Sequence, residues 1–248
     1  MRLVERANRG LIETRNQLLA EAGGEFVAWM DSDDLSHPER LERQVAAFES
    51  DADLVCIGSN VQLIDPEGRP LGVEEYPRDH LAVRAEQERG AGLRFPSTMQ
   101  RRSVAVEAGG FRHPFRIGED LDFLLRVAER GKVGNLPDFL YSYRQHLLST
   151  CTALGINWPQ ICKVILGLAD ERREHGTDRL QRGEEIELPK VGGDEARKLI
   201  PIVLLDWAKG AQSVGDRDRA LRYTLASIRN SPLRGASWRY LAKQLLRR

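Results

Sequence analysis

Three aspartates, Asp31, Asp33 and Asp34, follow a short apolar segment near the start of the chain. The apolar segment, residues 26–30, is typical of a strand buried on both faces of a largely parallel sheet. Ligands of such sheets bind beyond the carboxyl ends of the strands. Residues two apart on an extended backbone share a face, so Asp31 and Asp33 can converge on one cation. Oxygen ligands of this kind suit Mg²⁺ or Mn²⁺, and the sequence therefore predicts a site for a divalent cation and phosphate.

Glu119 and Asp120 form a second acidic group, directly before an apolar stripe of helical spacing. The stripe predicts a helix that starts at these acids and ends near Gly131. Acids at a helix N-terminus are stabilised by the helix dipole, and for the pair taken alone we favour that structural explanation. A role in proton transfer depends on the other motifs that accompany the pair.

The elements that must position these acids follow from hydrophobic spacing and turn residues. Apolar residues at helical spacing within 11–22 predict a helix that leads into the acidic strand. After the acids, Ser36-His37-Pro38-Glu39 has the form of a capping box that starts a second helix. Further expected elements are strands over 54–57 and 61–64, a turn over 65–68, and a loop with a helix within 76–94.

The composition limits the classes of function. Hydrophobic residues make up 41% of the 248 residues, charged residues make up 30%, and the formal net charge is zero. These values are typical of a globular protein and argue against a nucleic-acid partner. Three cysteines without ligand-like spacing predict neither disulfides nor a zinc site, which fits a reducing cytoplasm. Because no segment approaches about 20 apolar residues and the first residues lack a signal peptide's apolar core, we expect a cytoplasmic protein without a transmembrane segment, and peripheral membrane contact stays open.

The pattern changes after about residue 150. Strand signals stop, and helical stripes run to Arg248 with interruptions near 189–193 and at Ser231-Pro232. We therefore expect an α/β domain over residues 1–150 and an α-helical region over 151–248. The final segment is rich in arginine, which is typical of a solvated helix face but also of a surface that touches anionic lipid or a partner.

Short motifs occur in a recognisable order along residues 2–150. They are Asn8-Arg9-Gly10, Thr14-Arg15-Asn16, the run from Ala22-Gly23-Gly24 to Asp31-Ser32-Asp33-Asp34, Pro38-Glu39-Arg40, Pro96-Ser97-Thr98-Met99, Glu107-Ala108-Gly109-Gly110-Phe111, Gly118-Glu119-Asp120-Leu121-Asp122 and Tyr143-Arg144-Gln145-His146. Each motif is degenerate by itself, and the specificity comes from their order. Together they make the chain resemble the family-two glycosyltransferases of the GT-A fold.

This resemblance implies a metal-assisted enzyme that transfers a sugar, with inversion, from a nucleotide-diphosphate donor. It implies that Mn²⁺ or Mg²⁺ is held at Asp33, with Asp31 at the donor ribose or the metal and His146 as a further ligand. Arg15 and Arg144 would bind the donor, Arg144 by offsetting phosphate charge. The segment that contains His146 also fits an ordinary strand end with a surface histidine, and that alternative stays open.

On the acceptor side, the resemblance implies transfer to a hydroxyl of a glycan, a lipid-linked sugar or another acceptor. A single in-line displacement needs a base for the hydroxyl proton, and Asp120 would be that base. Glu119 would orient the site or the acceptor. The resemblance carries no information on the helical region.

The chain departs from the family at its start. Family members begin with a β-α-β-α-β segment that binds the nucleotide base, whereas here Met1 falls where the third strand ends, with Leu3 and Val4 as its remnant. The resemblance thus implies an α/β, N-terminally truncated three-layer GT-A fold with a mainly parallel sheet, an unpaired sheet edge, low stability and weak or absent activity. The competing explanations are a start site placed too far downstream, a gene fragment, and a short protein that completes its sheet as a homo-oligomer.

Two other functions compete with the transferase. An aspartyl-phosphate phosphatase also places Asp-x-Asp after an apolar strand, but it normally continues with Thr or Val where this chain has Asp34. A non-catalytic interaction module that keeps a transferase-like fold is the stronger alternative. Metal-dependent binding of a nucleoside diphosphate separates the enzyme from the module.

Overall fold

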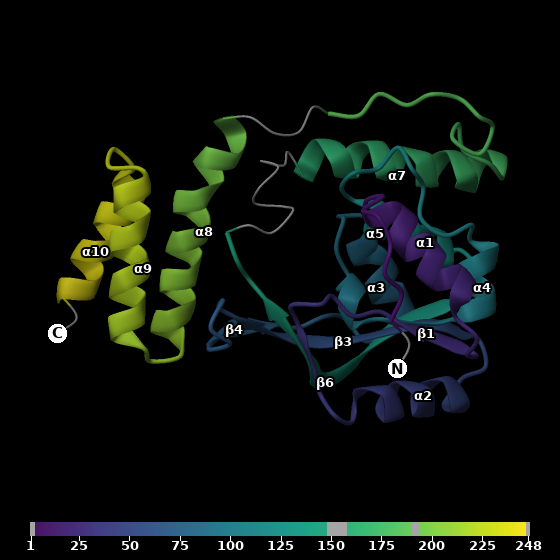
Figure 1. Cartoon of the computed structure of the whole chain (residues 1–248), viewed down its shortest axis with the longest axis horizontal. Helices are drawn as coiled ribbons and strands as arrows, with labels where there is room; N and C mark the ends of the chain where they lie inside the picture. Colours follow the sequence, from purple (N-terminus) through teal and green to yellow (C-terminus); the bar gives the residue numbers. More distant parts are fainter. Residues whose placement is uncertain (1–2, 148–157, 190–193, 247–248) are drawn as a thin grey trace.

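The computed structural model describes residues 3–147, 158–189 and 194–246, which form a mixed α/β domain beside a group of helices (Figure 1). The strands are β1 (Phe26–Ala28), β2 (Leu35–Ser36), β3 (Leu54–Ile64), β4 (Pro70–Glu74), β5 (Met99–Arg101) and β6 (Lys132–Arg144). The helices are α1 (Leu11–Glu21), α2 (Arg40–Ser50), α3 (His80–Gln87), η1 (Phe95–Ser97), α4 (Arg102–Glu107), α5 (Glu119–Ala128), α7 (Trp158–His175), α8 (Asp194–Ser213), α9 (Arg217–Asn230) and α10 (Gly235–Leu246). The expected α/β class and helical C-terminal region are confirmed.

The sheet is mixed rather than mainly parallel, so that part of the prediction is wrong. Its strand order is β1-β5-β3-β6-β2, with β4 paired to β3. Among the described strands, only the long pairing of β3 with β6 is parallel, and the other four pairings are antiparallel. The prediction failed because the apolar segment 26–30 is not a doubly buried strand: β1 ends at Ala28 and is half-buried, and Met30 is 52% exposed.

Strand β1 lies at an edge of the sheet. Within the described residues it pairs only with β5, which agrees with the expected unpaired edge. Leu3 and Val4 form no strand and are 79% and 44% exposed, so the prediction that they are a strand remnant is wrong.

Helices cover the sheet on both sides (Figure 1). Helix α2 packs on one side, where Phe48 and Phe26 stack at a ring-centroid distance of 4.6 Å. Helices α1, α3, α4 and α5 lie on the other side. The core there centres on aromatic rings, with Phe111 and Phe123 at 4.4 Å and Trp29 and Phe95 at 5.2 Å. This aromatic core fixes the segment between β1 and the three aspartates.

Two local predictions need correction. The expected strands over 54–57 and 61–64 are one continuous strand, β3, because the residues between them pair with β6 as well. The expected capping box at Ser36 is absent, since Ser36 belongs to β2 and α2 begins at Arg40 without a side-chain cap. The turn over 65–68 is confirmed by the hydrogen bond from Gly68 N to Asp65 O (2.9 Å) and by the positive φ of Gly68.

The C-terminal helices pack at two different places. Helix α7 lies along α5 and shares a core with it, with Ile161, Ile165 and Leu168 on its inner face. Helices α8, α9 and α10 stand beyond β4, and Leu71 of β4 packs against Leu204 and other residues of α8 and α9. The expected boundary near residue 150 lies outside the described residues. Across the described part of the chain, none of the helices is both long and apolar enough to cross a membrane.

Candidate active site

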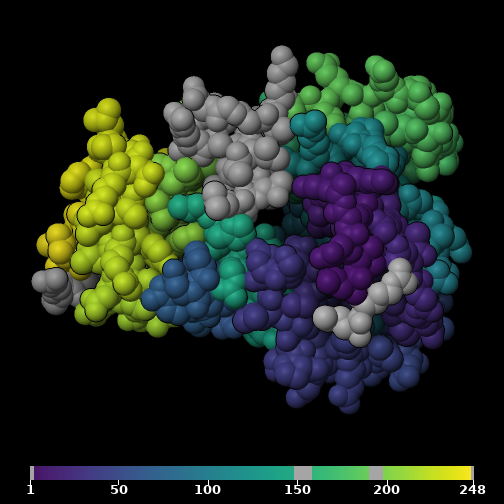
Figure 2. Space-filling model, viewed as in Figure 1, coloured from purple at the N-terminus to yellow at the C-terminus, as the bar shows by residue number. Residues whose placement is uncertain are grey.

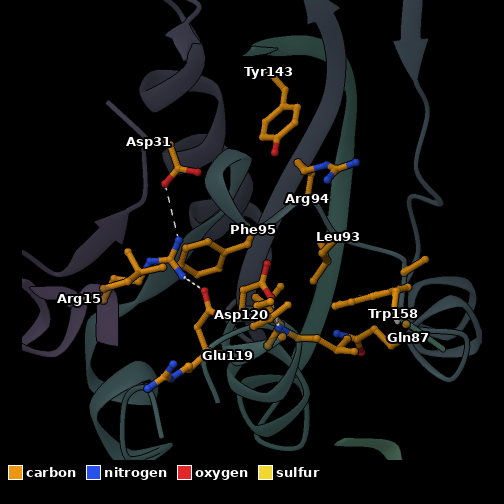
Figure 3. Close-up of a pocket in the computed structure, with 18 of the residues that line it drawn as sticks. Arg15, Asp31, Gln87, Leu93, Arg94, Phe95, Glu119, Asp120, Tyr143 and Trp158 are labelled. Atoms are coloured by element: carbon orange, nitrogen blue, oxygen red, sulfur yellow. Dashed lines mark hydrogen bonds and ion pairs between the residues drawn. The ribbon is translucent and has the colours of Figure 1, made fainter. Parts of the chain in front are cut away.

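A pocket of about 620 Å³ opens beside the aromatic core (Figure 3). Its walls come from the end of β1, the segment before α5, the segment around η1, the end of β6 and the first residue of α7. Six of the seven predicted site residues line it: Arg15, Asp31, Asp33, Glu119, Asp120 and His146. The two acidic motifs thus meet in space although they are far apart in the sequence.

The three aspartates after β1 point to different environments. Asp31 and Asp33 line the pocket, whereas Asp34 is 4% exposed and accepts a hydrogen bond from Arg144 N (2.7 Å) on its Oδ1. Its Oδ2 is buried without a hydrogen-bond partner among the described residues. Burial raises the pKa of Asp34 to about 6. Asp34 therefore fixes the loop to β6, and the other two remain available to a ligand.

Two buried side chains, Arg40 and Tyr141, hold the loop that carries these acids. The Arg40 guanidinium donates to Trp29 O (2.8 Å) and to Thr98 O (3.2 Å). The ring of Tyr141 lies 4.9 Å from that guanidinium, and the Tyr141 hydroxyl accepts from Asp31 N (3.1 Å). Both Arg40 and Tyr141 are 1% exposed. Since Arg40 and the Tyr141 hydroxyl bond to backbone atoms of Trp29, Thr98 and Asp31, they fix the course of the loop.

Arg15 connects the two acidic motifs (Figure 3). Its Nη1 lies 2.6 Å from Glu119 Oε1, and its Nη2 lies 3.6 Å from Asp31 Oδ1. The guanidinium also packs over the ring of Phe95, 4.5 Å from the centroid. Its two carboxylate contacts show that Arg15 sets the spacing of the acids, while direct donor binding by Arg15 stays a prediction.

The positive charge of Arg15 does not cancel the effect of burial on the pKa values of Asp31 and Glu119. Burial, helped by the negative charges of Asp33 and Asp120, raises the pKa of Asp31 above its ordinary value despite Arg15. Burial and the charge of Asp120 raise the pKa of Glu119 to about 7. Burial therefore outweighs the favourable contact of Arg15 at both carboxyl groups.

Glu119 and Asp120 begin α5 as predicted. The helix follows Gly118, whose φ of 78° lies in the left-handed region. A Cβ at Gly118 would lie 2.6 Å from Ile165 Cδ1 of α7, so this glycine also allows α7 to approach. Asp120 Oδ1 accepts from Leu121 N (2.8 Å), and the side chain lines the pocket. The pair is placed both to complement the helix dipole and to face a ligand.

His146 and Arg144 lie at the end of β6. His146 Nε2 is 2.9 Å from Asp33 Oδ2, which brings two of the predicted metal ligands together. Arg144 does not line the pocket: its guanidinium donates to Asp33 O (2.6 Å) and to Pro66 O (2.9 Å). Its contacts hold the Asp33 loop, and its role at a phosphate stays a prediction.

The described residues contain no cluster of three or more His, Cys, Asp and Glu side chains arranged to hold a metal ion. One or two carboxylates are nevertheless the usual protein ligands of Mg²⁺, which keeps several waters and takes further ligands from substrate phosphates. Asp33 and His146, with Asp31 on the same loop, fit such a partial set.

Sequence reasoning missed a polar cluster on the opposite wall of the pocket. Arg94 Nε donates to Glu74 Oε2 and to the Tyr76 hydroxyl, both at 3.1 Å, and its guanidinium lies 4.9 Å from the ring of Tyr143. Glu74 and Tyr76 are two residues apart at the end of β4, and this spacing on an extended backbone could have indicated that their side chains share a face. Arg94 lies in a segment without a clear periodic pattern, so nothing local indicated its partner.

Sequence reasoning also missed the contribution of α7. Trp158, its first residue, lines the pocket. A Cβ at Gly90 would lie 2.5 Å from Cys162 Sγ, so α7 closely approaches a second wall of the pocket. The helical stripe of α7 predicted that one face is buried, but it did not indicate which part of the protein packs against that face.

Comparisons with known proteins show which proteins the chain is similar to. Residues 1–107 match the family model described as Glycosyl transferase family 2. The putative glycosyltransferase EpsE of Bacillus subtilis is 32% identical over 143 residues, which are 56% of this chain and 50% of that protein. The amylovoran biosynthesis glycosyltransferase AmsE of Erwinia amylovora is 29% identical over 138 residues, 55% of this chain and 51% of that protein.

Among solved structures, the mannosyltransferase PcManGT from Pyrobaculum calidifontis, in complex with GDP-Man and Mn²⁺, is 17% identical with a TM-score of 0.41, over 97% of this chain and 65% of that one. The chain spans about half the length of the curated relatives it matches. Through the match over residues 1–107 and these two curated relatives, the chain is similar to glycosyl transferase family 2.

Proposed function

We propose that this protein transfers a sugar from a nucleotide-diphosphate donor to an acceptor hydroxyl with inversion at the anomeric carbon. The observation that carries the proposal is the convergence of Asp31 and Asp33 with Glu119 and Asp120 in one pocket. The match of residues 1–107 to the glycosyl transferase family 2 model supports the reaction class. The pocket supplies acids suited to its two chemical needs, a cation at the leaving group and a base at the acceptor.

Asp33 and His146 would hold Mn²⁺ or Mg²⁺, with Asp31 at the cation or the donor ribose. The 2.9 Å contact between Asp33 Oδ2 and His146 Nε2 supports this assignment. When bound, the cation supplies positive charge against the diphosphate that leaves. Arg15 keeps Asp31 at a fixed distance from Glu119, and Arg144 holds the backbone of Asp33.

Asp120 would accept the proton of the acceptor hydroxyl as that oxygen bonds to the anomeric carbon. Attack on the face opposite to the leaving diphosphate inverts the configuration. Glu119 is 6% exposed and bonded to Arg15, which suits a group that orients the site rather than one that exchanges protons with solvent. Because α5 begins at these residues, both carboxylates are held by a fixed helix end.

The acceptor belongs to polysaccharide or glycoconjugate synthesis in this proposal, either as a glycan or as a lipid-linked sugar. The name of AmsE, an amylovoran biosynthesis glycosyltransferase, supports this class. The pocket also presents Trp158 and Tyr143, whose aromatic rings suit the apolar faces of sugar rings.

The test is calorimetric binding of uridine or thymidine diphosphate to residues 1–248 with and without Mn²⁺. We expect Mn²⁺-dependent binding that Asp33→Ala abolishes and that Asp53→Ala, a 75% exposed carboxylate outside the pocket, leaves unchanged. Absence of binding at millimolar ligand would favour the alternative, a non-catalytic interaction module.

A further inference from the structure

The last two helices differ from the rest of the chain in charge. The whole chain has 37 basic and 37 acidic residues, but no Asp or Glu occurs after Asp218. Residues 219–248 contain eight Lys and Arg. One of them, Arg219, is 2% exposed and pairs with Asp65, whereas Arg229, Arg239 and Lys243 are exposed. The end of the molecule formed by α9 and α10 (yellow in Figure 2) is therefore a basic surface in a neutral protein.

Helix α10 exposes large apolar side chains on its outer face. Trp238 is 51% exposed, Leu245 is 50% and Leu246 is 85%, and they share this face with Arg239 and Lys243 at spacings of three and four residues. Together with Leu233 (99% exposed), in the turn before α10, they form what we call the α10 outer face. Apolar side chains and cations without acids are the composition of a helix that lies at a membrane surface.

The inner face of α10 is already covered. Ser237 is buried, with its Oγ 2.8 Å from Ser227 Oγ of α9. The turn before α10 is tied to the helix by a hydrogen bond from Trp238 Nε1 to the backbone oxygen of Pro232 (2.8 Å), the residue before the exposed Leu233. Since α9 lies between α10 and α8, the outer face points away from the rest of the protein (Figure 1).

We propose that the α10 outer face binds an anionic lipid surface. A second copy of the chain would bring the same cations to the contact, so charge repulsion opposes self-association through this face. Anionic headgroups instead supply the missing countercharges, and the acyl boundary takes up Leu233, Trp238, Leu245 and Leu246. The inference concerns a surface separate from the pocket and does not depend on the proposed reaction.

The test is flotation of full-length protein with phosphatidylcholine vesicles, with or without about one third phosphatidylglycerol. We expect binding only to the anionic vesicles and a decrease in binding as salt is raised. Each basic residue near such a surface changes the binding constant about fivefold, so Arg239→Gln with Lys243→Gln should weaken binding more than tenfold. Leu245→Ser with Leu246→Ser should weaken it at least as much, and it keeps the Trp238 hydrogen bond.

The matched control is Leu81→Ser with Arg89→Gln, which removes a 78% exposed leucine and an exposed arginine elsewhere on the surface. This control should bind as the unchanged protein does, and equal thermal unfolding of all variants excludes a folding defect. Failure to float with anionic vesicles, equal binding to neutral vesicles, or equal losses in the control overturns the proposal. So does light scattering that shows a dimer that only the α10 variants disrupt.

Discussion

Two buried carboxylate groups in this molecule are compensated to different degrees. Asp65, in the turn between β3 and β4, is fully buried and joins α9 to the sheet. It accepts hydrogen bonds from Arg69 N (2.8 Å), Arg219 Nη1 (2.9 Å) and the Tyr223 hydroxyl (2.9 Å). Although burial acts to raise it, these hydrogen bonds hold the pKa of Asp65 below its ordinary value. We call this arrangement the Asp65 junction.

The acids of the pocket lack such compensation. Arg15 contacts both Asp31 and Glu119, and burial raises the pKa of each carboxyl group above its ordinary value. Arg94, a second cation of the same pocket, already pairs with Glu74. A carboxylate that serves only the fold is expected to be fully paired, as Asp65 is. The carboxylates that Arg15 only partly compensates are the groups that a divalent cation or a proton would stabilise.

The largest expected effect is a loss of activity from a change in the pocket, which a change at the Asp65 junction should not reproduce. Asp120→Asn keeps the shape of the side chain but removes the proposed base, so transfer should fall by about 10²–10⁴-fold. Nucleotide binding should stay unchanged, because Asp120 bonds only to the neighbouring Leu121 N among the hydrogen bonds described. Product formation from a nucleotide sugar measures the transfer rate, and calorimetry measures donor binding. Transfer at the unchanged rate would remove Asp120 from the proposed reaction.

The next effect tests the junction by stability. Asp65→Asn leaves the buried Arg219 guanidinium with only the partly exposed Asp216 as a countercharge, so the free energy of unfolding should fall by about 3 kcal/mol. Urea denaturation followed by circular dichroism measures the change. The double variant Asp65→Asn, Arg219→Met removes both charges and should lose less than the sum of the single variants. Additive losses would mean that the pair is not coupled.

The third effect is the pH dependence of Glu119. Its pKa rises from an ordinary 4.5 to about 7 in the folded protein. The folded state therefore binds the proton more tightly, and this contribution to stability is fully present below pH 4.5 and lost as the pH rises through 7. The change amounts to about 3 kcal/mol at most. Since Gln does not titrate, the stability advantage of the unchanged protein over Glu119→Gln should shrink across that window.

Denaturant titrations of both proteins at several pH values measure this difference. Titrating groups that do not interact with Glu119 contribute equally to both proteins, so the comparison removes their effect. Asp65 provides the contrast, because its lowered pKa gives the opposite sign: its contribution is present above the ordinary pKa of 3.8 and is lost on acidification. A constant difference between the unchanged protein and Glu119→Gln would contradict the assignment.

The sequence predicted the acids of the pocket well because each pair lies at the end of an element with a local signal. Asp31 and Asp33 follow an apolar strand, and Glu119 and Asp120 precede a helical stripe. The order of motifs along residues 2–150 indicated a resemblance to a family, and the match of residues 1–107 to the family model supports that resemblance. The functional roles of these residues remain predictions, which the variants above test.

The sequence did not predict the features that depend on distant contacts. A helical stripe shows that one face of α7 is buried, but not that it packs on α5 and brings Trp158 to the pocket. An apolar segment does not reveal the direction of its neighbouring strand, so the antiparallel pairing of β1 with β5 was missed. Arg219 reads as a surface cation by its type, and only its contact with Asp65 shows otherwise.

The smallest effect concerns the packing beside the Asp65 junction. A Cβ at Gly210 of α8 would lie 2.2 Å from the backbone oxygen of Leu71, so α8 approaches β4 too closely for any side chain. Gly167 in α7 is a matched control, since a Cβ there would meet nothing within 4 Å. Gly167→Ala should stabilise the protein by about 0.5–1 kcal/mol through helix propensity alone, whereas Gly210→Ala should destabilise it by about 1–3 kcal/mol. Thermal unfolding of the two variants measures the difference, and a gain in stability for Gly210→Ala would show that α8 can move away from β4 without loss.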